Sequence, residues 1–378
     1  MKLWSKFSSA KTVLVLDISS GSVGAGLIKL QPRNIPLVLN TLRVPLYLKD
    51  KPDSNSIEKA LLRNIKGIIQ EIGNSSVDTV LVSFSSPWIT SRLRTYVQKS
   101  EKPFLVNRKH ISNILKEEEE NFKNDLEKRY IEKSEIFGSK ITNITLNGYE
   151  SNIFASQQTN DLEIQFMMYA GQKSSIDNIE REITNLIGVK NDMIFENFMF
   201  VFMKVFTRAF QNMHSALLVN MSNEALDLLL VKKSYPLVSI SLPFGPAYIA
   251  RAIQKKMNVP LEIAYSYISL FSDGALNSDT RRKFEELFRD IETEWTSSWE
   301  RVTSEIPKDQ VIPYKIFLIG SAQNESIIKT LLSGTFNNHK VEQVGKNSNL
   351  VKLISGYIDE VRVDERISIL AAYSNIAL

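Results

Sequence analysis

The sequence contains no cysteine, so it can form no disulfide bond, thiolate nucleophile or cysteine-based metal site. This absence fits a protein of a reducing compartment. Histidine is almost as scarce. His110, His214 and His339 stand in unrelated contexts, without the spacing of metal ligands or of a base beside a serine nucleophile. Acidic pairs such as Glu285 and Glu286 fall on expected exposed helix faces, which argues against paired-carboxylate catalysis.

Long apolar runs are also missing. The first one follows the N-terminal MKLWSKF and stops at Asp17, which is too short for the apolar region of a signal peptide. The most apolar later segment, residues 198–206, is interrupted by Lys204 and is shorter than a membrane-spanning helix. We therefore expect a soluble chain with no transmembrane segment, whose membrane contact is peripheral or made through a partner.

A strong excess of one charge is absent as well. The formal net charge is +4 over 378 residues, and no dense block of Lys and Arg interleaved with aromatic residues occurs. Such a block is the electrostatic footprint of nucleic-acid binding. We therefore expect no nucleic-acid partner.

The residues that are present predict an α/β fold. Apolar runs rich in Val, Ile and Leu predict strands over residues 11–17, 23–30, 36–48 and 77–84, and apolar steps of three and four predict a helix over residues 56–72. From residue 215 a similar order returns, with two strands joined by a turn, a third strand and a helix. A long helix at 279–304, a strand at 314–319 and an apolar-faced helix at 364–378 follow. The repeated order predicts two similar halves.

A different pattern separates the two halves. It predicts a half-exposed strand at residues 89–98, a long charged helix at 107–133, two strands at 140–147 and 162–170, and a helix at 174–187. This β-α-β-β-α order predicts a small inserted subdomain.

The most informative motif is the turn DISSGSVGAG, which begins at Asp17 between the first two expected strands. A P-loop would carry a lysine before Ser or Thr here and continue as a helix, whereas this turn lacks the lysine and continues as a strand. A tight Ser/Gly turn between strands can present N–H groups and hydroxyls to a phosphate, and Asp17 could orient a metal-bound water. An ordinary Gly/Ser hairpin explains the turn equally well. The candidate residues are Asp17, Ser19, Ser20, Gly21 and Ser22.

Two further segments favour the phosphate-binding interpretation. Residues 220–227 (NMSNEALD) form the corresponding turn of the second half, and Gly320-Ser321-Ala322 follows a buried strand. With these segments the chain resembles the actin-like ATPase superfamily, and within it the bacterial FtsA/PilM group of cell division and type IV pilus assembly. The resemblance implies ATP with Mg²⁺ as the cofactor, Asp17 as the residue at the metal, and further nucleotide contacts from Asn220, Ser222, Asp227, Gly320 and Ser321.

The same resemblance implies an actin-like (ribonuclease H-like) duplicated two-lobe fold. The segment VLVSFSSPWITSRLR looks like the start of the subdomain that the group inserts in its first lobe. The implied limits are residues 1–84 for the core of the first lobe, 85–190 for the inserted subdomain, 191–363 for the second lobe, and 364–378 for a closing helix that returns to the first lobe.

The departures from the family pattern are concentrated in the nucleotide motifs. Ser19 stands where the first loop has glycine, Asn220 replaces the aspartate of the second loop, and Glu224 brings a carboxylate to the phosphate position. Other substitutions are Gly24 for a basic residue, Ser222 and Asn223 for glycines, and Tyr265 for the acid that approaches the ribose. We therefore expect weak nucleotide binding or none, no catalytic residue, and a pseudo-ATPase.

The leading functional hypothesis is a PilM-like bacterial scaffold of a membrane-associated assembly, at the inner face of the cytoplasmic membrane. By resemblance, it would hold a short cytoplasmic tail of a membrane protein. The expected partner site contains Ser86, Trp88, Arg92 and Arg94, where the two arginines share a strand face and could pair with acids.

Two alternatives remain. An FtsA-like division protein would bind ATP, self-associate into polymers and use a C-terminal amphipathic anchor, which the final AAYSNIAL does not resemble. An active small-molecule kinase or ATPase would need intact phosphate loops and a catalytic acid, and the sequence shows neither.

Overall fold

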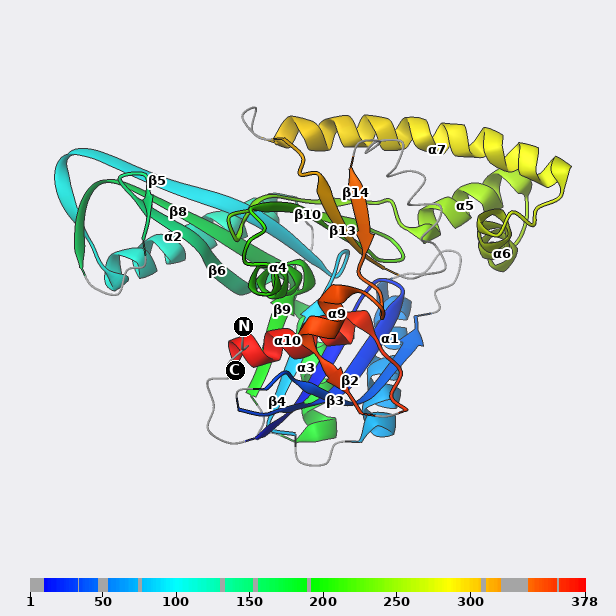
Figure 1. The fold of residues 1–378 in the computed structure, drawn as a ribbon, viewed down its shortest axis with the longest axis horizontal. Coiled ribbons are helices and arrows are strands. Elements are labelled where there is room, and N and C mark those ends of the chain that lie inside the picture. The colour runs from blue at the N-terminus through cyan, green and yellow to red at the C-terminus, as the bar shows by residue number, and fades with distance from the viewer. Residues whose placement is uncertain are drawn as a thin grey trace.

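The computed structural model describes residues 10–32, 34–46, 54–73, 77–129, 133–151, 156–188, 192–306, 311–320, 339–358 and 360–378. Within these residues the strands form three sheets, of six, five and four strands (Figure 1). None of the described helices combines the length and the apolar character that crossing a bilayer would need.

The first sheet has the strand order β15-β3-β2-β1-β4-β9. Its strands β1 and β2 form an antiparallel hairpin, while β4 and β9 continue the sheet in parallel. Helices α1 (Ser54–Ile72) and α3 (Lys173–Ile187) pack on one face, in a cluster with the even-numbered apolar residues of β1. The strands are β1 (Lys11–Ile18), β2 (Ser22–Leu30), β3 (Leu37–Pro45), β4 (Thr79–Phe84), β9 (Asp192–Asn197) and β15 (Gly356–Tyr357).

The second sheet repeats this arrangement in the order β12-β11-β10-β13-β14. Here β10 and β11 form the antiparallel hairpin, and β13 and β14 follow in parallel. The order and directions of these five strands match those of β3-β2-β1-β4-β9 in the first sheet. The predicted duplication is therefore confirmed. The strands are β10 (Ser215–Met221), β11 (Leu226–Lys232), β12 (Tyr235–Leu242), β13 (Lys315–Gly320) and β14 (Lys340–Gln343).

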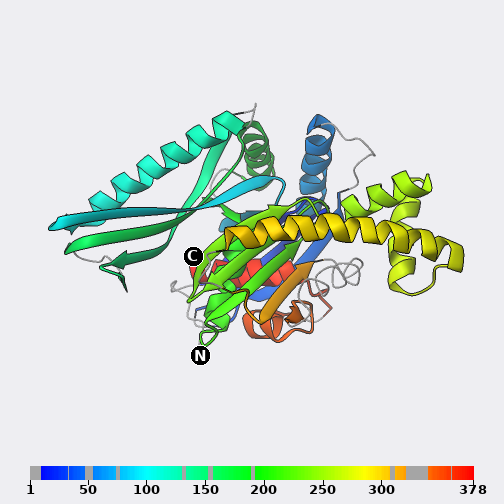
Figure 2. The ribbon, with the colours of Figure 1, turned by 90° about the horizontal axis from the view of Figure 1, so that it is seen from above.

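The second sheet shares one hydrophobic cluster with three helices, of which α7 lies over its outer face, while α5 and α6 pack together at one end of α7. These helices are α5 (Pro246–Met257), α6 (Leu261–Ser272) and α7 (Ser278–Glu305). The long helix α7 runs across this sheet in both ribbon views (Figures 1 and 2). Its Trp295 and Trp299 are buried in the cluster under the helix. Their helical spacing therefore reflects core packing.

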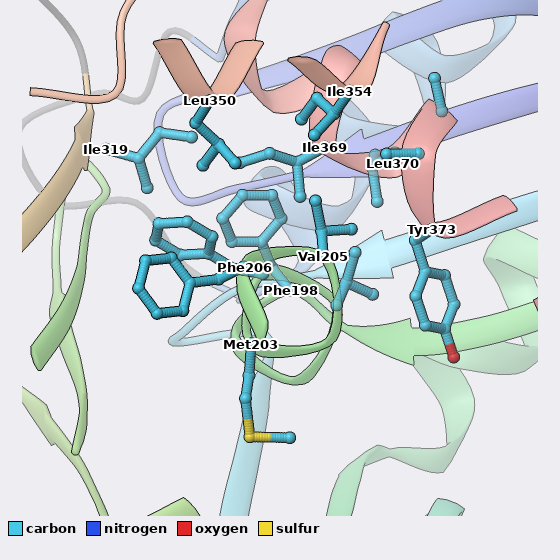
Figure 3. Packing of buried hydrophobic residues seen from close by; sticks show 14 of the residues in the cluster. Phe198, Met203, Val205, Phe206, Ile319, Leu350, Ile354, Ile369, Leu370 and Tyr373 are labelled. Carbon is cyan, nitrogen blue, oxygen red and sulfur yellow. The ribbon is translucent and has the colours of Figure 1, made fainter. Parts of the chain in front are cut away.

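A central layer of helices lies between the first and second sheets. It consists of α4 (Phe198–Ala209), α9 (Asn349–Ile354) and α10 (Glu365–Ala377), whose side chains meet in one cluster (Figure 3). The ring centroid of Phe206 on α4 lies 4.7 Å from that of Phe317 on β13, and Val13 and Val15 of β1 belong to the same cluster. The two lobes therefore share one hydrophobic core.

Helix α10 differs from its prediction in one respect. The sequence predicts a helix that is apolar on one face, but residues 366–375 are all buried. The reason is tertiary: α10 contacts α4 and α9 as well as β1, β2 and β3, so no side of the helix is left to water.

The third sheet has the order β5-β8-β6-β7 and extends away from the two lobes (Figure 2). Helix α2 (Arg108–Arg129) covers one of its faces through a separate cluster. The inserted limits 85–190 remain a prediction; α3, which falls inside them, shares its cluster with α1. The strands are β5 (Ile89–Val106), β6 (Ser134–Leu146), β7 (Tyr149–Glu150) and β8 (Gln157–Gln172).

Candidate functional site

The turns of the two hairpins touch each other. The backbone N–H of Glu224 donates to the Ser20 hydroxyl at 2.8 Å. A methyl group built at Gly21 would lie 2.5 Å from the Cβ of Asn223. The structure therefore brings the predicted phosphate-binding turns together, but it packs them directly on one another, and a phosphate group would have to separate them.

Asp17 lies at the end of β1 and has no exposed surface. Its Oδ2 accepts hydrogen bonds from Arg366 Nε at 2.6 Å and Arg43 Nη2 at 2.8 Å, and its Oδ1 accepts one from Arg366 Nη2 at 2.8 Å. Burial alone would raise the pKa of Asp17, but the charges of Arg366 and Arg43 outweigh burial and hold the pKa below its usual value. The carboxylate that was expected beside a metal is neutralised by two guanidinium groups.

Arg366, near the start of α10, lies between the two hairpins. Besides Asp17, it donates to the side-chain oxygen of Asn220 on β10 and, through Nη2, to the Ser85 hydroxyl at 2.8 Å. Its Cζ lies 3.6 Å from the ring centroid of Phe198, an arrangement that favours cation–π attraction. One buried side chain therefore joins residues of both lobes.

Arg43 on β3 extends this cluster toward the surface. It donates to Asp364 from Nε at 2.7 Å and from Nη2 at 3.1 Å, and to the Ser22 hydroxyl at 2.9 Å. Asp364 in turn caps α10, because its Oδ1 accepts from the N–H groups of Arg366 and Ile367 at 3.0 Å. Ser22 thus faces an arginine of its own chain.

The second turn is held by side chains of its own lobe. Asp227 accepts from Asn220 Nδ2 at 2.9 Å and from the Ser241 hydroxyl at 2.7 Å. Glu224 forms a two-pronged ion pair with Arg251, with N–O distances of 3.0 and 2.7 Å. The expected phosphate contacts Asn220 and Asp227 therefore bond to each other within the chain.

The remaining predicted residues are placed as follows. The Ser222 hydroxyl donates to the Ala225 and Ser86 carbonyl oxygens at 3.0 and 3.3 Å. The Ser19 hydroxyl donates to the Ser22 carbonyl at 3.1 Å. Gly320 ends β13, beside Met221, whereas Ser321 and Ala322 lie outside the described residues.

The expected partner residues divide into two groups. Trp88 Nε1 donates to the Ser19 carbonyl at 3.0 Å, so Trp88 and Ser86 both lie at the hairpin turns. Arg92 pairs with Asp125 on α2 at 2.7 Å, and Arg94 pairs with Glu118 at 2.6 Å and with Asp125 at 3.2 Å. Both arginines therefore already have acidic partners in the chain.

Sequence reasoning missed Arg43 and Arg366. Neither belongs to a local motif, because they lie 26 and 349 residues from Asp17 along the chain. The available signal was the position of Arg366 beside the apolar run ISILAAY. A charged side chain next to such a run is expected to be buried only with a partner.

A Mg²⁺-bound nucleotide does not fit this arrangement. Its metal would need the Asp17 oxygens that Arg366 and Arg43 occupy, and its phosphates would need the space that the two turns share. In the part of the chain that the structure describes, no group of three or more His, Asp or Glu side chains is placed to hold a metal ion.

Replacing Gly245 by alanine tests how firmly the second turn is held. Gly245 precedes α5, and a methyl group there would lie 2.0 Å from the Asn223 carbonyl oxygen, so the turn would have to move. We expect a loss of about 1–3 kcal/mol in the free energy of unfolding, measured by urea denaturation. Gly67→Ala is the control, because a methyl group at this position meets nothing within 4 Å. Since alanine favours a helix more than glycine does, this change should not lower the stability. Equal stability of Gly245→Ala and the parent would contradict the rigid contact.

No protein-family model and no curated protein matches the sequence. Solved structures do match. A PilM–PilN type IV pilus biogenesis complex is similar over 98% of this chain and 98% of the matched chain, with a TM-score of 0.62 and 15% identity. The chain has the actin-like fold.

Two other solved structures are similar at lower scores. One is a Bacteroides thetaiotaomicron protein with an actin-like ATPase fold, with 12% identity, a TM-score of 0.44 and coverage of 96% of both chains. The other is the ethanolamine utilization protein EutJ from Carboxydothermus hydrogenoformans, with 8% identity, a TM-score of 0.42, and coverage of 89% of this chain and 85% of that one. The similarity to the PilM–PilN structure along the whole chain confirms the predicted fold class.

Proposed function

We propose that this actin-fold chain is a PilM-like scaffold, without ATP hydrolysis, for a membrane-associated assembly of the type IV pilus kind. In this role it lies at the inner face of the cytoplasmic membrane and holds a short cytoplasmic tail of a membrane protein. The supporting observation is the similarity along the whole chain to PilM, whose matched structure is a complex with PilN. The division-protein and kinase alternatives both need a nucleotide site, and the pairing of Asp17 with two arginines favours neither.

The proposed site for the tail is the outer edge of β5. This strand pairs with β8 on one side, and no strand among the described residues pairs with its other side. It approaches β12 near Ser91, whose hydroxyl lies 3.5 Å from that of Ser239. An unpaired edge offers N–H and C=O groups to an extended peptide, which can add a strand there.

The side chains of β5 have separate parts in this proposal. Arg92 and Arg94 are engaged by α2, so an acid of the tail would have to compete with Asp125 and Glu118. Ser86 and Trp88 fix the start of the strand against the hairpin turns. Val97 is 51% exposed and is available to an apolar side chain of the tail. Main-chain hydrogen bonds and Val97 therefore supply the affinity.

Binding of synthetic peptides tests this proposal. The peptides would be the short cytoplasmic tails of single-span membrane proteins encoded beside the gene of this chain, labelled for fluorescence anisotropy. We expect one of them to bind, and Val97→Asp to weaken that binding about tenfold, because a charge at the edge loses the apolar contact.

Tyr149→Asp is the matched control for this experiment. Tyr149 is 78% exposed on β7, at the opposite edge of the same sheet. The same type of change should therefore leave peptide binding unchanged. The proposal fails if no tail binds, or if Tyr149→Asp weakens binding and Val97→Asp does not.

A further inference from the structure

We propose that Arg366 replaces a metal–nucleotide complex as the link between the lobes, so that the cleft of this chain is permanently closed. We call Arg366 and its four contacts, Asp17, Ser85, Asn220 and Phe198, the arginine clamp. The inference goes beyond a scaffold function, because it concerns whether the two lobes respond to nucleotide at all.

The clamp uses all three nitrogen atoms of the guanidinium group. Nε and Nη2 donate to the two oxygens of Asp17, at 2.6 and 2.8 Å, in the two-pronged geometry that suits arginine and carboxylate. Nη2 also donates to Ser85, and Nη1 donates to Asn220. Asp17 lies near the end of β1 and Ser85 directly follows β4, both in the first sheet, whereas Asn220 belongs to β10 of the second sheet. Arg366 therefore connects the two sheets through hydrogen bonds that only a fork-shaped cation can make together.

The ion-paired groups of the clamp and of the adjacent Arg43 balance in charge without any ligand. A buried carboxylate needs a neutralising partner, since an unpaired buried charge is very costly. Asp17 obtains it from Arg366 and Arg43, and Arg43 is also paired with Asp364. These two arginines and two aspartates sum to zero. No positive charge in this set is left over for the phosphates of a nucleotide.

A second contact closes the same junction independently. The turns of the two hairpins touch through Ser20 and Glu224, and the Cβ of Asn223 lies over Gly21. A nucleotide would have to break this contact as well as displace Arg366 from Asp17. The clamp and the turn contact together fix the distance between the lobes.

The distance between the lobes can be measured directly, because the chain has no native cysteine. Cysteines introduced as Lys66→Cys on α1 and Lys256→Cys on α5 lie at exposed positions of the two lobes. Spin labels on this pair report the distance by pulsed electron resonance. In the otherwise unchanged chain we expect one narrow distribution that MgATP does not shift.

Arg366→Met in the labelled chain should broaden the distribution toward longer distances. Methionine keeps an apolar stem near Phe198 but cannot donate to Asp17 or Asn220. Arg362→Met is the matched control, because Arg362 is exposed a few residues earlier and should leave the distribution narrow. In Arg366→Ala, guanidinium acetate at millimolar, non-denaturing concentration should restore the narrow distribution, and methylammonium acetate should not.

Two results would overturn the proposal. One is a shift of the distance distribution when MgATP is added to the labelled chain that keeps Arg366. This measurement does not require any clamp variant to fold. The other is an Arg366→Met distribution as narrow as that of the parent. If Arg366→Met does not fold, Asn220→Ala is measured in its place. This change removes the partner of Arg366 in the second lobe and leaves the Arg366–Asp17 pair intact. A distance distribution for Asn220→Ala that is as narrow as that of the parent would also reject the proposal. Peptide binding at β5 is measured separately, so either proposal can fail alone.

Discussion

The Arg366→Met variant is expected to lose about 3–5 kcal/mol of the free energy of unfolding, because removing one partner of a buried ion pair strands the other charge. Asp17 is fully buried and would keep only Arg43. The side-chain oxygens of Asn220 and Ser85 would also lose their hydrogen bonds to the guanidinium group. Urea denaturation followed by circular dichroism measures the loss.

Arg43→Met is the comparison within the same cluster. The Arg43 side chain is 26% exposed, and Asp17 would retain its two-pronged pair with Arg366. We therefore expect a smaller loss, about 1–2 kcal/mol. Arg362→Met, at an exposed position, should change stability by less than about 0.5 kcal/mol. Equal losses for Arg366→Met and Arg362→Met would show that the buried pair contributes no more than a surface charge.

The Glu196→Ala variant is expected to lose about 2–4 kcal/mol, because it leaves two buried tyrosine hydroxyls without their acceptor. Glu196 on β9 is 1% exposed and accepts from Tyr373 at 2.7 Å and from Tyr169. Lys140 also donates to it at 2.8 Å, but Lys140 is partly exposed and can turn to water. Burial, together with the Glu196 carboxylate, raises the pKa of both tyrosines, so they remain protonated donors.

Glu196 also joins three parts of the fold, since Lys140 and Tyr169 belong to the third sheet and Tyr373 to α10. Loss of the carboxylate should therefore speed amide hydrogen exchange in β8 as well as lower global stability. Glu196→Gln, which keeps an acceptor oxygen, should lose less than Glu196→Ala. Glu163→Ala, an exposed change on β8, is the control. If the amide hydrogen-exchange rates in β8 are the same in Glu196→Ala and the parent, Glu196 does not anchor the third sheet to the rest of the fold.

Local patterns predicted the parts of the fold whose burial is one-sided or alternating. The hairpins, α1 and α7 follow directly from such periodicity. The segment 198–206 carried no clear period, because α4 is buried around most of its circumference between two sheets. The strand expected at residues 89–98 continues as far as Val106. Its pairing with β8 is interrupted over residues 100–103 and resumes at Phe104, so the local pattern of residues 89–98 did not reveal the full length of the strand.

The candidate site was predictable only where it is local. The turn motif drew attention to Asp17, Ser20 and Gly21, which lie close together because adjacent strands bring their own turn with them. The partners of Asp17 come from β3 and α10, and no spacing rule connects residues so far apart in the chain. The sequence motif thus indicated where the two turns lie, but only the tertiary structure revealed the arginine that pairs with Asp17.

The shared central layer also bears on how the chain folds during synthesis. Translation delivers β1 and β2 long before α10, yet all three contribute to one hydrophobic cluster. Until the residues of α10 are available, the inner face of the first sheet lacks its cover and Asp17 lacks Arg366. Domains that form continuous segments can fold one after another as they leave the ribosome. The first sheet of this chain is covered by a helix from far along the sequence, so its core can be completed only after α10 has been synthesised.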